Sequence, residues 1–194
     1  MTFTQVFIAT FLLITYTSHC ETKETNKLIM LKEAKILLKD TAKQYKNTLI
    51  QGLKHNDLKK ALKYCNKEVE KLVSKGNEKN FSIKRVSLKP RKKSNQPNLY
   101  EKEILEKFNI LNIKNNKNLI LEHNEIITND NNNKFVYVKA IRIKELCLNC
   151  HGSNINDDLK KEIQKLYPDD QAINYKLNDI RGAFVVYRNI KDLK

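Results

Sequence analysis

The sequence predicts an α+β fold in which an antiparallel sheet follows a long N-terminal helix and is flanked by short helices. Three observations support this class. Apolar residues recur every three or four positions over 23–54, which is a helical period. An alternating run begins at Phe81, and a final strand begins at Asp179. Two further strand-like runs flank an Asn-rich turn.

The first helix is predicted over 23–54, with a stripe that includes Ala34, Leu38 and Ala42. A helix this long usually lies along a partner helix or a second subunit, which is compatible with a homodimer. A second helix is predicted from an Asn56 cap to about Ser74. Its apolar stripe comprises Leu58, Ala61 or Leu62, Cys65, Val69 and Leu72.

The sheet follows in the sequence. "FSIKRVSLK" from Phe81 is a strand ended by Pro90, and "PRKKSNQPN" is a loop. A short helix starts at Asn98. "NLILEHNEIIT" and "KFVYVKAIRI" form a hairpin around "NDNNN". A helix capped by Asn156 ends before Pro168, and "DIRGAFVVYRNI" is the last strand. The sheet is expected to be covered on one side.

Composition and charge give a weaker signal. The 194 residues suit one domain plus a targeting segment, and the net charge is +15. The lysines are spread over every segment, so a solvated surface is favoured over nucleic-acid binding. The charge is also compatible with an acidic partner or an anionic membrane surface.

Residues 1–20 differ from the 21–194 domain. "VFIATFLLI" is apolar but too short to span a bilayer, and the polar run "TYTSHC" follows. This is the form of a secretory signal, and it predicts an exported, periplasmic protein. Cys20 is a candidate for lipidation, and an uncleaved N-terminal membrane anchor is the alternative. Removal of Cys20 would leave an odd number of thiols, namely Cys65, Cys147 and Cys150.

The stretch "CLNCH" is the attachment signature of c-type haem. Two intervening residues allow Cys147 and Cys150 to reach the two vinyl groups on one porphyrin edge. His151 is then directed at the iron as an axial ligand. Two alternatives remain: a redox-active disulfide, and a zinc site with His151 and Cys65.

A second axial ligand has several candidates in the sequence: Cys65, His55, His123 and Met30. The two histidines are expected at ordinary surface or half-buried positions, and Met30 is expected to pack. Cys65 differs because it is the odd thiol on an apolar helical stripe. A buried thiol also behaves as a small hydrophobe, so packing is its alternative explanation.

Several segments together resemble the PAS-like c-type haem domains of bacterial sensors, a family often catalogued as a domain of unknown function. These are "ALKYCN", "IKRVSLKPRKKSNQPN", "CLNCHG" and "YPDDQAINYKLNDIRGAF". The resemblance implies a PAS-like fold, one covalent haem on Cys147 and Cys150, and axial ligation by His151 and Cys65. The chain departs from the family at Lys92-Lys93, and at Asn174 and Asn178, where glycines are common. Asn tolerates positive φ, so these turns should survive.

The expected function is an exported haem sensor of redox state or of a small gas, signalling through a protein partner. Plain electron transfer without signalling is the alternative. An enzyme is the least favoured class, because no dedicated acid or base accompanies the CLNCH motif. Arg85, Arg91 and Lys84 are candidates to pair with haem propionates, with solvated strand and loop charge as the alternative.

Overall fold

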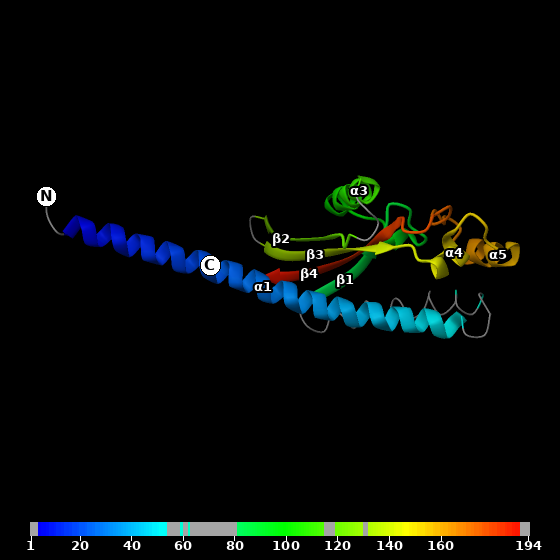
Figure 1. Cartoon of the computed structure of the whole chain (residues 1–194), viewed down its shortest axis with the longest axis horizontal. Helices are drawn as coiled ribbons and strands as arrows, with labels where there is room; N and C mark the ends of the chain where they lie inside the picture. The colour runs from blue at the N-terminus through cyan, green and yellow to red at the C-terminus, as the bar shows by residue number, and fades with distance from the viewer. Residues whose placement is uncertain are drawn as a thin grey trace.

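The computed structural model describes residues 4–53, 59, 62, 81–114, 119–129 and 132–190. The class is α+β, as predicted (Figure 1). The elements, in chain order, are α1 (Thr4–Leu53), β1 (Phe81–Val86), the 3-10 turn η2 (Lys93–Asn95), α3 (Leu99–Lys114), β2 (Glu122–Asn129), β3 (Asn132–Arg142), α4 (Glu145–His151), α5 (Asp157–Leu166) and β4 (Ile180–Ile190).

The described strands form one antiparallel sheet in the order β1-β4-β3-β2. The predicted hairpin is confirmed, because β2 and β3 pair from Glu122↔Lys139 to Asn129↔Asn132. The predicted last strand is the central strand β4, which lies between β1 and β3. β1 ends earlier than predicted, since Ser87 leaves the strand and its hydroxyl donates to the Arg181 carbonyl at 2.7 Å.

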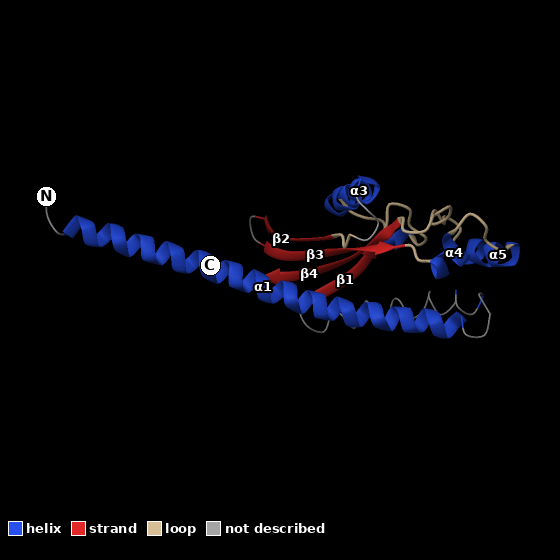
Figure 2. Cartoon of the chain, viewed as in Figure 1, coloured by secondary structure: helices blue, strands red, loops and turns tan. Residues whose placement is uncertain are grey.

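Both faces of the sheet are covered, so the prediction of a cover on one side was wrong (Figure 2). α3 packs on one face through Ile104, Leu105 and Phe108. α1 packs on the other through Ala34 and Leu38. The physical reason lies in the central strands, where consecutive residues are buried on both sides: 135–138 of β3 and 183–186 of β4. We call these the α3 face and the α1 face.

α1 begins at Thr4, well before the predicted start, and ends at Leu53 as expected. No proline or glycine interrupts the chain before Gly52, so nothing in the sequence ends the helix early. Each helical residue adds about 1.5 Å of length, so a helix of this size is roughly 75 Å long. Its N-terminal part therefore extends past the sheet (Figure 1). No described helix is sufficiently long and apolar to cross a membrane.

The predicted helix starts at Asn98 and Asn156 are confirmed, whereas the predicted cap at Asn56 lies outside the described residues. The Asn98 side chain accepts from the Glu101 amide at 2.9 Å, and the Glu101 carboxylate accepts from the Asn98 amide at 2.9 Å. This reciprocal pair is a capping box that begins α3. Asn156 accepts from the Asp158 and Leu159 amides at 3.0 and 3.4 Å and begins α5. α3 is longer than expected and ends at Lys114.

A β-bulge breaks the alternation at the start of β4. Ile141 pairs with Gly182 and Arg142 pairs with Ile180, so Arg181 has no opposite residue on β3. Gly182 has φ +154, and a Cβ there would lie 2.2 Å from the Val86 carbonyl oxygen. Only glycine therefore fits, and the bulge redirects the Arg181 side chain.

Candidate functional site

The CLNCH motif forms α4, a helix of seven residues at one end of the sheet (Figure 1). Cys147 and Cys150 are free thiols, half-buried and not joined to each other. Burial raises the pKa of Cys150, while the charge of Arg91 opposes this shift. The helix ends at Gly152, where a Cβ would lie 2.7 Å from the Leu148 carbonyl oxygen. The two thiols and His151 therefore lie within two turns of one short helix.

His151 has one ring nitrogen engaged by the backbone. Its Nδ1 lies 2.7 Å from the Ala172 carbonyl oxygen. A carbonyl can only accept, so Nδ1 carries the proton. Burial, and then the charges of Arg181 and Arg91, lower the pKa of His151 well below 6.5. The neutral ring therefore keeps a lone pair on Nε2. An imidazole oriented through Nδ1–H to a carbonyl is the usual form of a metal-ligating histidine.

The segment 170–175 encloses the C-terminal end of α4. The Tyr175 amide donates to the His151 carbonyl at 2.9 Å, and the Asn174 amide donates to the Gly152 carbonyl at 3.2 Å. Asn174 and Asn178 have φ of 60 and 71, which confirms the prediction that asparagine preserves these turns. The Tyr175 ring also lies edge-on to the His151 ring, with 6.2 Å between the two ring centres. This segment thus orients the histidine.

Arg91, a predicted propionate partner, is already engaged by the protein. Its guanidinium forms an ion pair with Asp170 at 3.0 Å and donates to the Cys150 carbonyl at 2.5 Å. It also donates to the Ala172 carbonyl at 3.3 Å. These contacts join the loop after β1 to α4 and to the segment around Asp170. The alternative of a solvated loop charge was wrong for Arg91, whose side chain is largely buried.

Arg85 and Arg181 are the other guanidinium groups near His151, since each acts on the pKa of that ring. Arg85 stacks over the Tyr45 ring of α1 at 4.7 Å. Arg181 is buried, and its Nη1 donates to the Ser87 hydroxyl at 2.8 Å. Sequence reasoning missed Arg181, although Gly182 beside it in a strand is the usual signal of a bulge.

Three other predicted candidates lie away from the motif. Lys84 is on the α3 face, where it forms an ion pair with Glu101 at 2.6 Å. His123 on β2 contacts Glu125 at 3.3 Å, and its ring centre lies 6.3 Å from that of Tyr100. Met30 is buried in the core between α1 and the sheet, which confirms that it packs.

The predicted second helix lies outside the described residues except for Lys59 and Leu62, which are helical. Cys65 and His55 therefore have no described position. Leu62 is buried against Leu159 and Ile163 of α5, in a cluster that Cys150 also contacts. Leu62 thus shares a cluster with one of the two thiols.

The alternatives of a redox-active disulfide and of a zinc site stay predictions. Cys147 and Cys150 are not bonded, and no three His, Cys, Asp or Glu side chains of the described residues gather to hold a metal ion. Cys65, the remaining zinc ligand of that alternative, lies outside this part of the chain.

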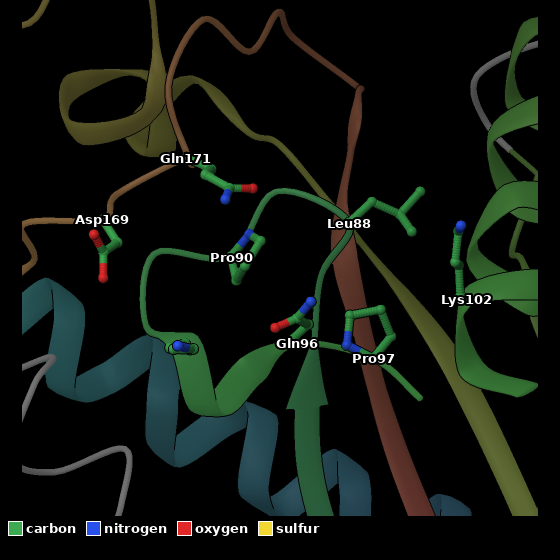
Figure 3. Close-up of a pocket in the computed structure, with 8 residues that line it drawn as sticks. Leu88, Pro90, Gln96, Pro97, Lys102, Asp169 and Gln171 are labelled. Atoms are coloured by element: carbon green, nitrogen blue, oxygen red, sulfur yellow. The ribbon is translucent and has the colours of Figure 1, made fainter. Parts of the chain in front are cut away.

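A pocket of about 500 Å³ lies between the loop after β1, the start of α3 and the segment 169–171 (Figure 3). It is lined by Leu88, Pro90, Lys93, Gln96, Pro97, Lys102, Asp169 and Gln171. Neither thiol nor His151 lines it, so it is separate from the α4 site.

The comparisons with known proteins agree with this fold. The model of the Tll0287-like family matches residues 19–188. The chain belongs to the Tll0287-like family. A solved structure, that of the cyanobacterial haem protein Tll0287, is similar with a TM-score of 0.60 at 20% identity. The match covers 84% of this chain and 96% of that one. No curated protein matches.

Proposed function

We propose that this protein binds one c-type haem, attached covalently through Cys147 and Cys150, with His151 as an axial iron ligand. The observation that supports this most is the state of His151, a neutral ring whose Nδ1–H is held by Ala172 beside two free thiols. The described residues around α4 thus fit the group. The haem of the similar solved protein also supports the proposal.

Cys65 is proposed as the second axial ligand. Leu62 precedes it by three residues, and Leu62 packs in the cluster that includes Cys150. Positions i and i+3 share a helix face, so the sequence predicts Leu62 and Cys65 on one apolar stripe. A thiolate ligand is expected to favour ferric iron and to lower the reduction potential.

The proposed role is a sensor of redox state or of a small gas in the periplasm, with a PAS-like fold and a protein partner for the signal. A bound haem supplies a one-electron couple and a coordination position for a small ligand. In the sensor role, Cys65 would hold the iron only in the oxidised state, so that the reduced haem would offer a coordination position to a small ligand. In the electron-transfer alternative, Cys65 would hold the iron in both oxidation states.

Export stays a prediction, with either removal of residues 1–20 or, alternatively, lipidation at Cys20. A homodimer through α1 is also proposed. Ile29 and Ile36 lie two turns apart on this helix and are 50% and 54% exposed, whereas the core-facing Ala34 is fully buried. A replacement of Ile36 by lysine should then shift the molar mass from dimer to monomer in light scattering.

The test of the haem proposal is expression of the full chain in a bacterium with a cytochrome c maturation system. Intact mass should show one haem added, and Cys147→Ala with Cys150→Ala should show none. Bare polypeptide from the wild type would overturn the proposal.

Absorption spectra test the ligands of the haem-loaded protein. Cys65→Ala should alter the ferric spectrum, whereas His123→Ala, on β2, should not. Carbon monoxide should bind the reduced wild type if the sensor role holds. Failure of CO to bind, with Cys65 ligated in both states, would favour electron transfer instead.

A further inference from the structure

Two guanidinium groups near His151 have a buried nitrogen without a partner. The Nε atoms of Arg85 and Arg181 are buried and make no hydrogen bond within the described part of the chain. Arg181 as a whole is only 7% exposed. A buried N–H that is left unsatisfied loses its hydration without compensation, and the penalty is larger in a charged group. Such atoms in a folded protein call for an explanation.

The charges around these atoms are also unbalanced. Arg91 has Asp170 as its ion-pair partner, but neither Arg85 nor Arg181 has a carboxylate partner among the described residues. Burial, and then the neighbouring charge of Arg85, lower the pKa of Arg181 to about 10. Buried charges are normally paired, so the pair of arginines lacks an anion.

Both side chains are fixed in place by other contacts. Arg181 is anchored through Nη1 by the Ser87 hydroxyl, and its guanidinium lies 5.6 Å from the centre of the Tyr175 ring. Arg85 lies over the Tyr45 and Phe184 rings at 4.7 and 5.7 Å. Fixed donors lose little entropy when a ligand binds, which is the usual construction of a binding site.

We propose that Arg85 and Arg181 together form a carboxylate-binding site that receives the propionate groups of the haem. The inference rests on the proposed function. It assigns recognition of the haem propionates to Arg181, whose side chain is redirected by the β-bulge beside Gly182. Guanidinium groups match carboxylates in shape and charge. Arg91 is not assigned to this site, because its Nε donates to Asp170 and its Nη2 donates to the Cys150 and Ala172 carbonyls.

The experiment compares two fluorescent porphyrins in titrations of the full chain purified without haem. Zinc protoporphyrin IX has two free carboxylates, and its dimethyl ester has none. The wild type should bind the free acid at least about tenfold more tightly, because hydrogen bonds to a charged group are stronger than those to an ester. Arg85→Gln and Arg181→Gln should each remove most of this preference, and Arg181→Lys should keep part of it.

Arg188→Gln is the matched control, since it removes the same charge from the α1 face but from an arginine paired with Glu33. It should keep the full preference. Circular dichroism of each variant checks that the fold is retained. Equal binding of the two porphyrins by the wild type, binding of neither, or loss of preference in the control would overturn the site.

Two further measurements separate the possible failures. Intact mass of the haem-loaded protein tests the proposed function alone, so an attached haem without any acid-over-ester preference would overturn only the present inference. Succinate should not raise the melting temperature of the haem-loaded wild type. If succinate raises the melting temperature and Arg181→Gln abolishes this rise, the site binds a free carboxylate. The proposal that it binds the haem propionates would then be overturned.

Discussion

The two faces of the sheet differ in whether their buried charged side chains have hydrogen-bond partners. On the α3 face, Glu101 is fully buried and fully satisfied: it accepts from the Asn98 amide, from the Tyr187 hydroxyl at 2.6 Å and from Lys84 at 2.6 Å. On the α1 face, Arg85 and Arg181 retain buried nitrogens without partners among the described residues. A satisfied buried network stabilises a fold, whereas unsatisfied buried groups call for an explanation, which the proposed carboxylate site would supply.

The largest loss of stability is expected from Gly182→Val, which should disrupt the bulge that places Arg181. A side chain there meets the Val86 carbonyl and cannot adopt φ +154 without strain. We expect a loss of about 4 kcal/mol in the free energy of unfolding, measured by urea denaturation. A loss under about 1 kcal/mol, the size of an ordinary substitution, would mean that the bulge is not required to place Arg181.

Glu101→Ala should have the next largest effect. It leaves Lys84, the Asn98 amide and the Tyr187 hydroxyl without their acceptor. The Lys84 side chain is half-exposed, so the cost arises mainly from the buried donors that lose their acceptor, about 2 kcal/mol in total. Glu103→Ala, at an exposed position of the same helix, is the control. A surface substitution of this kind should change stability by less than about 0.5 kcal/mol. Equal effects of the two substitutions would contradict a structural network at Glu101.

Glu122 gives a pH-dependent effect, because it joins α1 to the sheet. Burial alone would raise its pKa, but hydrogen bonds from Lys35 of α1 and Lys139 of β3 outweigh this and lower the pKa to about 2. The carboxylate therefore stabilises the fold above pH 4.5, and this stability is lost as the pH falls from 4.5 to 2. After allowance for solvent screening of the exposed lysines, about 2 kcal/mol is expected.

Urea denaturation between pH 6 and pH 3 measures this contribution. Glu122→Gln should be less stable than the wild type at pH 6 and should show a smaller further loss on acidification. Identical pH profiles for the two proteins would show that these lysines do not stabilise the carboxylate.

The smallest effect is expected from Arg85→Leu in the haem-free chain. The substitution loses stacking on Tyr45 and Phe184 but also removes repulsion from Arg181. These contributions oppose each other, so the free energy of unfolding should change by less than about 1 kcal/mol. A loss comparable to that of Glu101→Ala would make Arg85 a structural residue and remove the contrast between the faces.

Local patterns in the sequence determined most of the elements. Alternation over 134–143 and the Asn-rich turn determined the hairpin, and Asn98 and Asn156 determined the starts of two helices. The same holds for the motif, because Cys147, Cys150 and His151 are close along the chain and need no fold to bring them together. The turns at Asn174 and Asn178 followed from the tolerance of asparagine for positive φ.

Tertiary structure decided the contacts between residues that are far apart in the sequence. The cover on both faces depends on which helices pack on the buried central strands, and alternation in one strand does not contain that information. Arg91 became an internal ion-pair partner because Asp170, far from it in the sequence, folds beside it. Arg181 came to the side of His151 because one residue bulges from β4. A shift of one residue exchanges the faces of a strand, and only the pairing with the neighbouring strand reveals it.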